Sequence, residues 1–379
     1  MTGEGISIGR VFGISIRIHI SWFIILCLMS WSLLTSFPLD WGLTVRVIVA
    51  IVSSLLFFAS VLLHELMHSL IAIRNKIPVA AITLFVFGGV AQITEEPRKP
   101  GVEFRVAIAG PIASIVLGLV LWAVYFYLLP SGAAIFIVVV SWLGWINLIL
   151  GIFNLVPAFP MDGGRVLRSI IWWRTHNLRR STRIASIIGK VFAALFIIGG
   201  IYLAVFTYYG FNGLWFAFVG WFLYGAASGS YQQLVVQQAL QGHTAREAMT
   251  GDYTQVLRGM KISELAGSAV LACGRSCFVV SADALPLGVV TTHEIKNMSG
   301  SNRESRTVEQ IMKPIDRIKT VRPGDELARA MSILTEQNAS CVPVIEEGRL
   351  FGVISRDNLL NFINFKESIG FQPSNDVSG

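Results

Sequence analysis

The 379-residue sequence predicts a polytopic α-helical membrane protein that ends in a small cytosolic α/β domain built from two repeats. Three observations predict this fold class. Hydrophobic residues make up 54% of the chain and charged residues only 14%, which is well below the quarter that is typical of soluble domains. Long apolar blocks fill residues 1–230, whereas residues 243–379 have the composition of a soluble protein. Within that second part, a sequence pattern recurs after 64 residues.

Six apolar segments are long enough to cross a bilayer, which requires about 20 residues. They are residues 19–38, 46–73, 105–129, 133–157, 186–209 and 212–229. Lys and Arg gather at the N-terminus and in segments 74–104 and 158–185, while the opposite connections carry none except Arg46 at an edge. Because positively charged loops stay in the cytoplasm, we predict a multi-pass cell-membrane protein whose N-terminus and C-terminal domain are both cytoplasmic.

The net charge of +7 resides in the membrane half. Residues 1–242 contain 15 basic and 7 acidic side chains, and residues 243–379 contain 15 and 16. The basic excess therefore reflects topology, and no nucleic-acid partner is expected. The four cysteines form no dense disulfide framework. Cys273 and Cys277, with three residues between them, are interpreted as two core thiols because no second pair lies nearby.

Residues 79–96 contain two β-rich runs, 82–87 and 90–94, separated by Gly88 and Gly89. Two such runs joined by a two-residue glycine turn are typical of a β-hairpin. Non-helical backbone at membrane depth is tolerated where it is buried in protein or lines a wet cavity. We therefore predict a re-entrant β-hairpin, and an irregular loop on the membrane surface is the alternative.

Two histidines and a glutamate interrupt the second apolar segment. His64, Glu65 and His68 have the H-E-x-x-H spacing of zinc proteases, in which two histidines on one helix face bind the metal. Ionisable groups in a span are costly and by default indicate function. An isolated histidine would more simply be a satisfied core residue, but two histidines that flank an acid favour a metal site. Catalytic zinc takes three protein ligands, so one more is required.

The acidic residues of the membrane half indicate that third ligand. Five of the seven are assigned to termini or loops with ordinary solvated roles: Glu4, Asp40, Glu95, Glu96 and Glu103. Only Glu65 and Asp162 are embedded in apolar sequence. The predicted topology places both acids near the cytoplasmic ends of their spans, so Asp162 is the predicted third ligand.

The combined motifs resemble a known family. An H-E-x-x-H in a span, followed by Asn154-Leu-Val-Pro-Ala-Phe-Pro-Met-Asp162-Gly-Gly, is similar to the site-2 protease family of intramembrane zinc metalloproteases. The resemblance covers about residues 60–165. It implies a zinc metalloendopeptidase that cleaves the transmembrane segments of membrane-anchored regulatory proteins, in regulated intramembrane proteolysis. Its partners would be a membrane-embedded protein substrate and the lipid bilayer.

The same resemblance implies a role for each matching residue. His64, His68 and Asp162 would hold one catalytic Zn²⁺, and Glu65 would be the general base. The hairpin with Gly88 and Gly89 would bind the unwound substrate by strand addition. Asn154 would donate a hydrogen bond to the oxyanion, and a helix-end cap before Pro157 is the alternative interpretation for this residue.

The soluble half contains an internal repeat. Residues 288–295 align with 352–359, and residues 244–249 align with 307–312. Each unit is expected to contain a short helix, a strand, a helix, a β-hairpin and a closing helix. The two units resemble a cystathionine-β-synthase (CBS) domain pair, with repeats at 244–300 and 301–366. A linker at 231–243 would join them to a transmembrane domain at 1–230, and residues 367–379 would form a disordered tail.

Many CBS pairs bind an adenine nucleotide through an Asp that closes a T/S-x-x-D motif. The matching positions are Thr291 with Glu294 and Ser355 with Asn358, and neither has the Asp. Nucleotide binding that regulates access to the zinc site therefore remains one interpretation. A structural role, including homodimer formation through the CBS domains, is the other.

A transporter or channel is the main alternative from another class. CBS pairs also regulate ion transporters, and intramembrane acids mark ion paths. No further intramembrane acid or base is predicted to extend such a path, whereas the two embedded acids accompany a histidine pair. The sequence therefore favours the protease.

Overall fold

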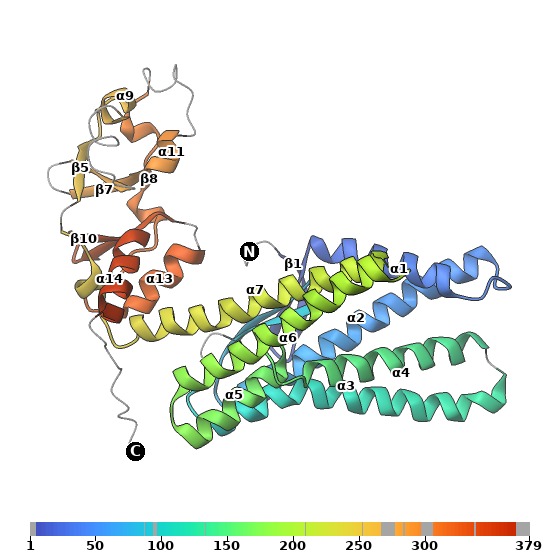
Figure 1. Cartoon of the computed structure of the whole chain (residues 1–379). Helices are drawn as coiled ribbons and strands as arrows, with labels where there is room; N and C mark the ends of the chain where they lie inside the picture. Colours follow the sequence, from blue (N-terminus) through green and yellow to red (C-terminus); the bar gives the residue numbers. More distant parts are fainter. Residues whose placement is uncertain are drawn as a thin grey trace. The chain divides into compact units, whose positions relative to one another are not determined.

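The computed structural model describes residues 5–86, 88–93, 97–132, 134–208, 210–251, 253–266, 277–282, 285–296, 306–336 and 339–368. Two compact units make up the chain, Met1–Leu234 and Val235–Gly379. Cys273 and most of the predicted tail, residues 369–379, lie outside the described residues. Figure 1 shows the elements of both units in chain order.

The first unit contains seven helices among its described residues. They are α1 (Ser21–Ser36), α2 (Leu43–Arg74), α3 (Pro100–Leu128), α4 (Ala134–Asn154), α5 (Asp162–Thr175), α6 (Leu178–Phe206) and α7 (Gly210–Leu240), whose last residues enter the second unit. The 3₁₀ turn Leu129–Ser131 follows α3. Helix α3 packs against three other helices of the unit, α2, α4 and α5.

Four helices of the described chain are long and apolar enough to cross a membrane: α2, α3, α4 and α6. Helix α1, at 16 residues, is shorter, and α7 overlaps the sixth predicted segment. The membrane protein is thereby confirmed, and the number of six spans stays a prediction. Helix α2 has 32 residues and is about 48 Å long at 1.5 Å per residue, so it exceeds a hydrocarbon core of about 30 Å.

A four-stranded sheet accompanies these helices. It contains β1 (Gly5–Val11), β2 (Ile14–His19), β3 (Val79–Phe85) and β4 (Gly88–Ile93) in spatial order. The two hairpins β1–β2 and β3–β4 are antiparallel, and β2 pairs with β3 in parallel. The predicted hairpin is therefore half of a larger sheet. The N-terminal pair of strands was not predicted, although the alternate burial of Ile14 and Ile16 in β2 follows the period of two that marks a strand.

The predicted turn of the second hairpin is wrong by two residues. Phe85 pairs with Gly88, and Leu84 pairs with Gly89. The chain therefore reverses before Gly88, and both glycines belong to β4. In this register both Gly89 and Ala91 of β4 lie against Glu65 of helix α2.

The second unit has the two predicted repeats. The first contains α8 (Ala245–Ala248), β5 (Thr254–Leu257), α9 (Ile262–Leu265), β6 (Cys277–Ala282), β7 (Leu285–Thr291) and α11 (Thr292–Lys296). The second contains the 3₁₀ turns Val308–Gln310 and Ile315–Arg317, β8 (Lys313–Pro314), α13 (Leu327–Glu336), β9 (Cys341–Glu346), β10 (Arg349–Ser355) and α14 (Arg356–Ser368). The first repeat contains a four-stranded sheet of order β5-β6-β7-β8, whose last strand comes from the second repeat. The second repeat contains a two-stranded sheet of order β10-β9.

The repeats exchange their opening segments. Ala245 and Ala248 of the first repeat pack in the core of the second, with Leu327 and Ile354. In return, Val308 of the second repeat packs in the core of the first. Both opening turns begin with a capping box, and the Thr244 backbone N–H lowers the pKa of the boxed Glu247 carboxyl below its ordinary value. Because each core needs a segment of the other repeat, the two repeats form one cooperative domain.

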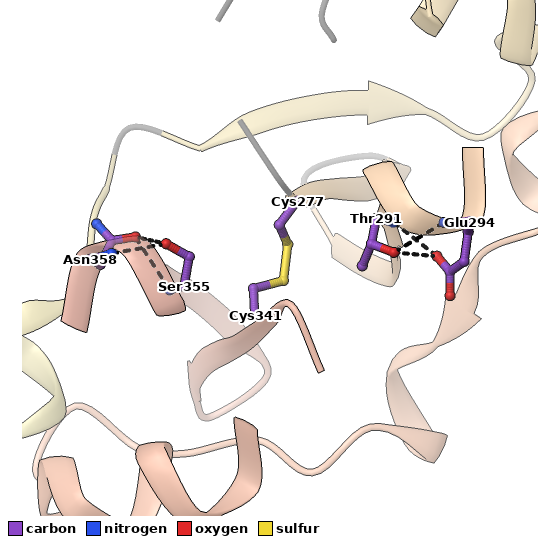
Figure 2. The surroundings of a disulfide bond; sticks show 6 residues. All are labelled: Cys277, Thr291, Glu294, Cys341, Ser355 and Asn358. Atoms are coloured by element: carbon purple, nitrogen blue, oxygen red, sulfur yellow. Dashed lines mark hydrogen bonds between the residues drawn. A yellow bond between two sulfur atoms is a disulfide. The ribbon is translucent and has the colours of Figure 1, made fainter. Parts of the chain in front are cut away.

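A disulfide joins the two repeats at equivalent positions. Cys277 begins β6 and Cys341 begins β9, their Cα atoms are 6.2 Å apart, and 64 residues separate them. Figure 2 shows this bond between the motif Thr291–Glu294 and the motif Ser355–Asn358. The prediction that Cys277 is a core thiol is therefore wrong. The repeat brings its two equivalent strands together, and the local spacing to Cys273 gave no sign of that pairing.

Candidate metal and active site

Helix α2 carries the histidine pair in the interior of the first unit. His64 and His68 are one helical turn apart, so they share a face. Each is only 4% exposed, and their Nε2 atoms are 3.2 Å apart. The two facing nitrogens can therefore serve as ligands of one shared cation.

Helix α3 orients both imidazole rings through contacts with their Nδ1 atoms. The Nδ1–H of His68 donates to the Val106 carbonyl at 2.6 Å, and Nδ1 of His64 lies 2.9 Å from Ser114 Oγ. A carbonyl can only accept, so the proton of neutral His68 is on Nδ1 and its Nε2 is a bare acceptor. Such outer contacts fix the tautomer and direction of metal-binding histidines. Both Nε2 atoms are thus available to one cation.

Asp162 meets the histidines from another helix. It is the first residue of α5, and its Oδ2 lies 3.2 Å from Nε2 of His64 and 3.1 Å from Nε2 of His68. The chain reaches this position through a tight loop that folds back on the first turn of α5. A side chain at Gly163 would overlap the carbonyls of Leu155 and Val156, so the glycine after Asp162 permits the close approach.

These three side chains fit a zinc ion. Within the part of the chain that the structure describes, one group of metal-type ligands is found, and it consists of His64, His68 and Asp162 with ligand atoms within 4.8 Å of one another. Zinc–ligand bonds of about 2.0–2.1 Å in a tetrahedron place neighbouring ligands about 3.3 Å apart. The observed separations of 3.1 and 3.2 Å match that edge. Three protein ligands also leave the fourth position for water, as in catalytic zinc sites.

Gly110 of α3 provides the space for this cluster. A Cβ at this position would overlap Nε2 of His68 and lie 2.6 Å from Nε2 of His64. Any side chain would therefore displace the ligand atoms themselves. Val106, Gly110 and Ser114 recur every four residues along one face of α3, and this stripe forms the wall behind the two imidazoles.

Glu65 lies between the cluster and the sheet. Its Oε2 accepts a hydrogen bond from the backbone N–H of Ala91 in β4 at 3.2 Å. A Cβ at Gly89 would lie 2.5 Å from Cγ of Glu65. The edge strand β4 therefore runs directly beside this carboxylate, and its glycine lets the two approach.

The other predicted residues have the following places. Gly88 begins β4 with φ +124°, a conformation that favours glycine. Asn154 is the last residue of α4 and is half-buried. The structure thus places Gly89 next to Glu65 and Gly88 beside open space, and it gives Asn154 a helix end that is compatible with either of its two interpretations.

The motif residues of the CBS repeats act as helix caps. Thr291 donates from its backbone N–H to Oε2 of Glu294 at 2.9 Å, and Lys313 lies 3.2 Å from Oε1 of the same residue. At the equivalent position, the Asn358 N–H donates to Oγ of Ser355 at 3.1 Å, and the Ser355 N–H donates to Oδ1 of Asn358 at 3.3 Å (Figure 2). Both pairs thus form reciprocal caps of the kind found at helix N-termini.

One acid was assigned wrongly from the sequence. Glu103 was placed among the solvated loop residues, but it lies in the first turn of α3 and is fully buried. The Nε–H of Arg168 in α5 donates to its Oε1 at 2.6 Å. The apolar block of α3 begins after this residue, so the sequence placed the helix start too late. Counting apolar residues cannot detect a buried charge whose partner is 65 residues away.

The geometry defines a class of protein. A helical H-E-x-x-H whose histidines converge with a carboxylate from a second helix, in a bundle of apolar helices, is the ligand arrangement of a zinc peptidase in a membrane protein. Comparison with known families agrees. The model of peptidase family M50 matches residues 52–136 and 129–199, and the CBS domain model matches residues 308–364.

Relatives resemble nearly the whole chain. A candidate zinc metalloprotease of Synechocystis sp., sll0528, is 35% identical and covers 94% of this chain and 95% of its own. Another, Rip3 of Mycobacterium tuberculosis, is 30% identical and covers 95% and 93%. The solved site-2 protease of Methanocaldococcus jannaschii is 30% identical, covers 60% of this chain and 95% of that chain, and has a TM-score of 0.44.

The chain therefore belongs to peptidase family M50, the site-2 protease family, and it carries a C-terminal CBS domain. It is a zinc metalloprotease with membrane-embedded helices, as the resemblance implied. The transporter alternative is set aside, because the relatives that span the chain are named as metalloproteases.

Proposed function

We propose that this protein hydrolyses peptide bonds within the transmembrane segments of membrane-anchored regulatory proteins. The observation that carries the proposal is the meeting of three Lewis-basic atoms, 3.1–3.2 Å apart, beside a carboxylate and an edge strand. The ligands are His64, His68 and Asp162. Zinc, when bound, supplies a Lewis acid that lowers the pKa of a coordinated water to about 7.

Glu65 is the proposed general base. Its carboxylate takes a proton from the attacking water and later returns it to the leaving amine nitrogen. The Ala91 N–H donates to one oxygen, Oε2, at 3.2 Å, and in this scheme the other oxygen takes the proton. In this scheme Asn154 donates a hydrogen bond to the oxyanion of the peptide carbonyl.

The edge strand β4 is the proposed substrate platform. A helical transmembrane segment has its backbone groups bonded internally, so it must unwind before it is cut. An extended segment can then add to the edge of a sheet through main-chain hydrogen bonds. Because Gly89 of β4 adjoins Glu65, a strand added here brings its peptide bonds next to the base and the ligands.

The proposed topology has six spans, with both termini in the cytoplasm. It rests on the distribution of Lys and Arg, which occur in segments 74–104 and 158–185 and not in the opposite connections. In this orientation the catalytic residues lie near the cytoplasmic ends of α2 and α4, where water can reach them from the cytoplasm. The cleaved substrate would release its soluble part to the same side.

Substrate trapping tests the proposed function. Cells that express a Glu65→Gln variant should accumulate uncut single-span proteins that the wild type removes, and mass spectrometry of the membranes would identify them. Loss of a general base is expected to lower the cleavage rate by about 10²- to 10⁴-fold. An Asp40→Asn variant is the matched control, because Asp40 is an acid of the same unit in a connection between helices. Wild-type cleavage by Glu65→Gln would refute the assignment of the base.

We also propose that the CBS pair binds an adenine nucleotide and alters access to the zinc site. Support comes from the equivalent motifs at the ends of β7 and β10, which face opposite sides of one disulfide. The side-chain oxygens of Glu294 and Asn358 already accept hydrogen bonds as helix caps. A bound nucleotide would have to share or replace these hydrogen bonds. Calorimetry of the full chain with ATP, ADP and AMP tests it, and absence of heat with all three would leave the caps structural.

A homodimer through the CBS domains is the remaining proposal. Leu360 and Phe365 of α14 are 55% and 61% exposed, and burial of such side chains against a second copy would be favourable. Light scattering of the purified protein should give twice the chain mass. A Leu360→Glu variant should shift that mass toward the monomer, and an unchanged mass in both proteins would exclude this interface.

A further inference from the structure

A buried ion pair connects the two helices that complete the metal cluster. Glu103 of α3 and Arg168 of α5 have side chains only 1% and 7% exposed. The Nε–H of Arg168 donates to Oε1 of Glu103 at 2.6 Å, and a guanidinium nitrogen approaches the same oxygen. The guanidinium also lies over the ring of Phe159, 5.5 Å from its centre.

Each end of this pair is connected through a few residues of its helix to the candidate metal site. Glu103 is three residues before Val106, whose carbonyl accepts from His68. Arg168 is six residues after Asp162, which is about 9 Å along the helix, and Phe159 is three residues before it. Arg168 therefore contacts the chain on one side of Asp162 and belongs to the helix on the other.

Stability alone is a weak reason for such a pair. Desolvation of two charges consumes much of their attraction, and apolar side chains of the same volume often stabilise a fold equally well. A charged pair also fixes the relative position of the two helices, because its hydrogen bonds form only in one arrangement. In this protein, the position of α5 relative to α3 would determine whether the Asp162 carboxylate reaches the two imidazoles that α3 orients.

We propose that Glu103 and Arg168 are positioning residues that hold Asp162 in register with His64 and His68. The pair locks the start of α5 against α3, so that Oδ2 of Asp162 meets both Nε2 atoms at 3.1–3.2 Å. Without the pair, the first turn of α5 is free to shift, and the third ligand is weakened although no ligand has been removed. This inference rests on the proposed role of Asp162 as a zinc ligand.

The rate of zinc loss tests the proposal. Full-length protein in detergent is mixed with a chromogenic chelator, and zinc release is followed by absorbance. Arg168→Met should release zinc about 10- to 100-fold faster than wild type, the usual effect of removing an outer contact to a metal site. Arg168→Lys should fall between the two, because it keeps the charge. Arg174→Met is the matched control, an exposed arginine in the same helix, and should release zinc as wild type does.

A second measurement separates positioning from general loosening. In protein loaded with Co²⁺, the visible spectrum reports the ligand geometry, and Arg168→Met should change it while Arg174→Met should not. If Arg168→Met does not fold, the double variant Glu103→Leu with Arg168→Met takes its place, since it removes the hydrogen bonds without leaving one buried charge unpaired. The same faster zinc release and altered spectrum are expected of it.

The Asp162→Asn variant distinguishes a wrong ligand set from a wrong positioning role. If it releases zinc no faster than wild type, the proposed ligand set is wrong. If Asp162→Asn releases zinc faster but Arg168→Met, or the double variant in its place, behaves as wild type in both measurements, the ligand set stands and the positioning role is refuted. Equal acceleration by Arg168→Met and Arg174→Met would also refute it.

Discussion

Two glycines shape the candidate metal and active site because they leave space for its larger side chains. The imidazoles of His64 and His68 occupy the volume that a side chain at Gly110 would fill, and Glu65 occupies the volume beside Gly89. Protein interiors are close-packed, so one added methyl group forces a neighbour to move. The absence of a side chain at these two glycines is therefore as important to the site as the ligands are.

Substitution of Gly110 by alanine should disrupt the zinc ligands. The new Cβ would overlap Nε2 of His68, and overpacking of this kind costs about 1–3 kcal/mol. We expect zinc affinity to fall about tenfold to a hundredfold, measured by titration with a competing chelator. Gly101→Ala in the same helix is the control, because nothing lies within 4 Å of its added Cβ. Equal zinc affinity of the two variants would contradict this account of the site.

Substitution of Gly89 by alanine should separate catalysis from metal binding. Its Cβ would press on Cγ of Glu65 and leave the three ligands untouched. Cleavage should fall by at least about tenfold, since the base contributes about 10²–10⁴, while zinc content stays at one ion per chain. Gly9→Ala, in the opposite edge strand with open space around it, should cleave normally. A Gly89→Ala variant that loses its zinc would show that β4 shapes the ligands and not the base.

Elements contribute by carrying groups from distant parts of the chain to one place. Helix α2 supplies the imidazoles, α3 their orientation, α5 the carboxylate and β4 the partner of Glu65. In the second unit, strands β6 and β9 bring Cys277 and Cys341 together, and each cysteine pairs across its hairpin with the first residue of a cap, Thr291 or Ser355. The disulfide therefore ties together the two strand pairs that carry the caps.

Loss of the disulfide should destabilise the CBS unit. A cross-link that closes a loop of 64 residues is expected to contribute about 4 kcal/mol by restricting the unfolded chain. Cys341→Ser should therefore speed limited proteolysis of the C-terminal unit in the full chain, and a thiol reductant should do the same to the wild type. Cys27→Ser is the control, because Cys27 is a free, exposed cysteine of the first unit. Wild-type resistance in Cys341→Ser would mean that the bond adds nothing to stability.

The whole molecule joins a membrane unit to a soluble unit through α7, whose residues belong to both. The orientation of the first unit determines the compartment of the second. With an even number of spans the CBS pair returns to the side of the N-terminus, and an odd number would place it outside the cell. Topology is therefore the property of the whole chain on which any regulatory role of the CBS pair depends.

Cysteine labelling tests that topology. In a background without free cysteines, a membrane-impermeant maleimide applied to intact cells should label Asp40→Cys and Tyr208→Cys. Lys99→Cys and Asn177→Cys should react only after the membrane is opened, because they lie in the basic segments that the proposed topology places in the cytoplasm. Protection of Tyr208→Cys in intact cells would show that α6 and α7 do not both cross the membrane.

The sequence predicted most of the elements for simple physical reasons. Apolar runs longer than a bilayer predict helices, and the 64-residue period predicts two α/β repeats, which the structure contains. It also selected His64, Glu65 and His68, because one helical turn suffices to place them together. Asp162 could be selected only because few acids stand in apolar sequence, and that same criterion overlooked Glu103.

The contacts between segments that are distant in sequence could be seen only in the folded chain. Three residues of the apolar helix α3 become part of the site only because α3 packs against α2: Val106, Gly110 and Ser114. The pairing of β2 with β3, the exchange of opening segments between the repeats and the disulfide likewise join residues that no local pattern relates. Local sequence determines which groups a helix or strand presents on each face. Which of these faces meet depends on the packing of the whole chain, and the three proposed zinc ligands come together only there.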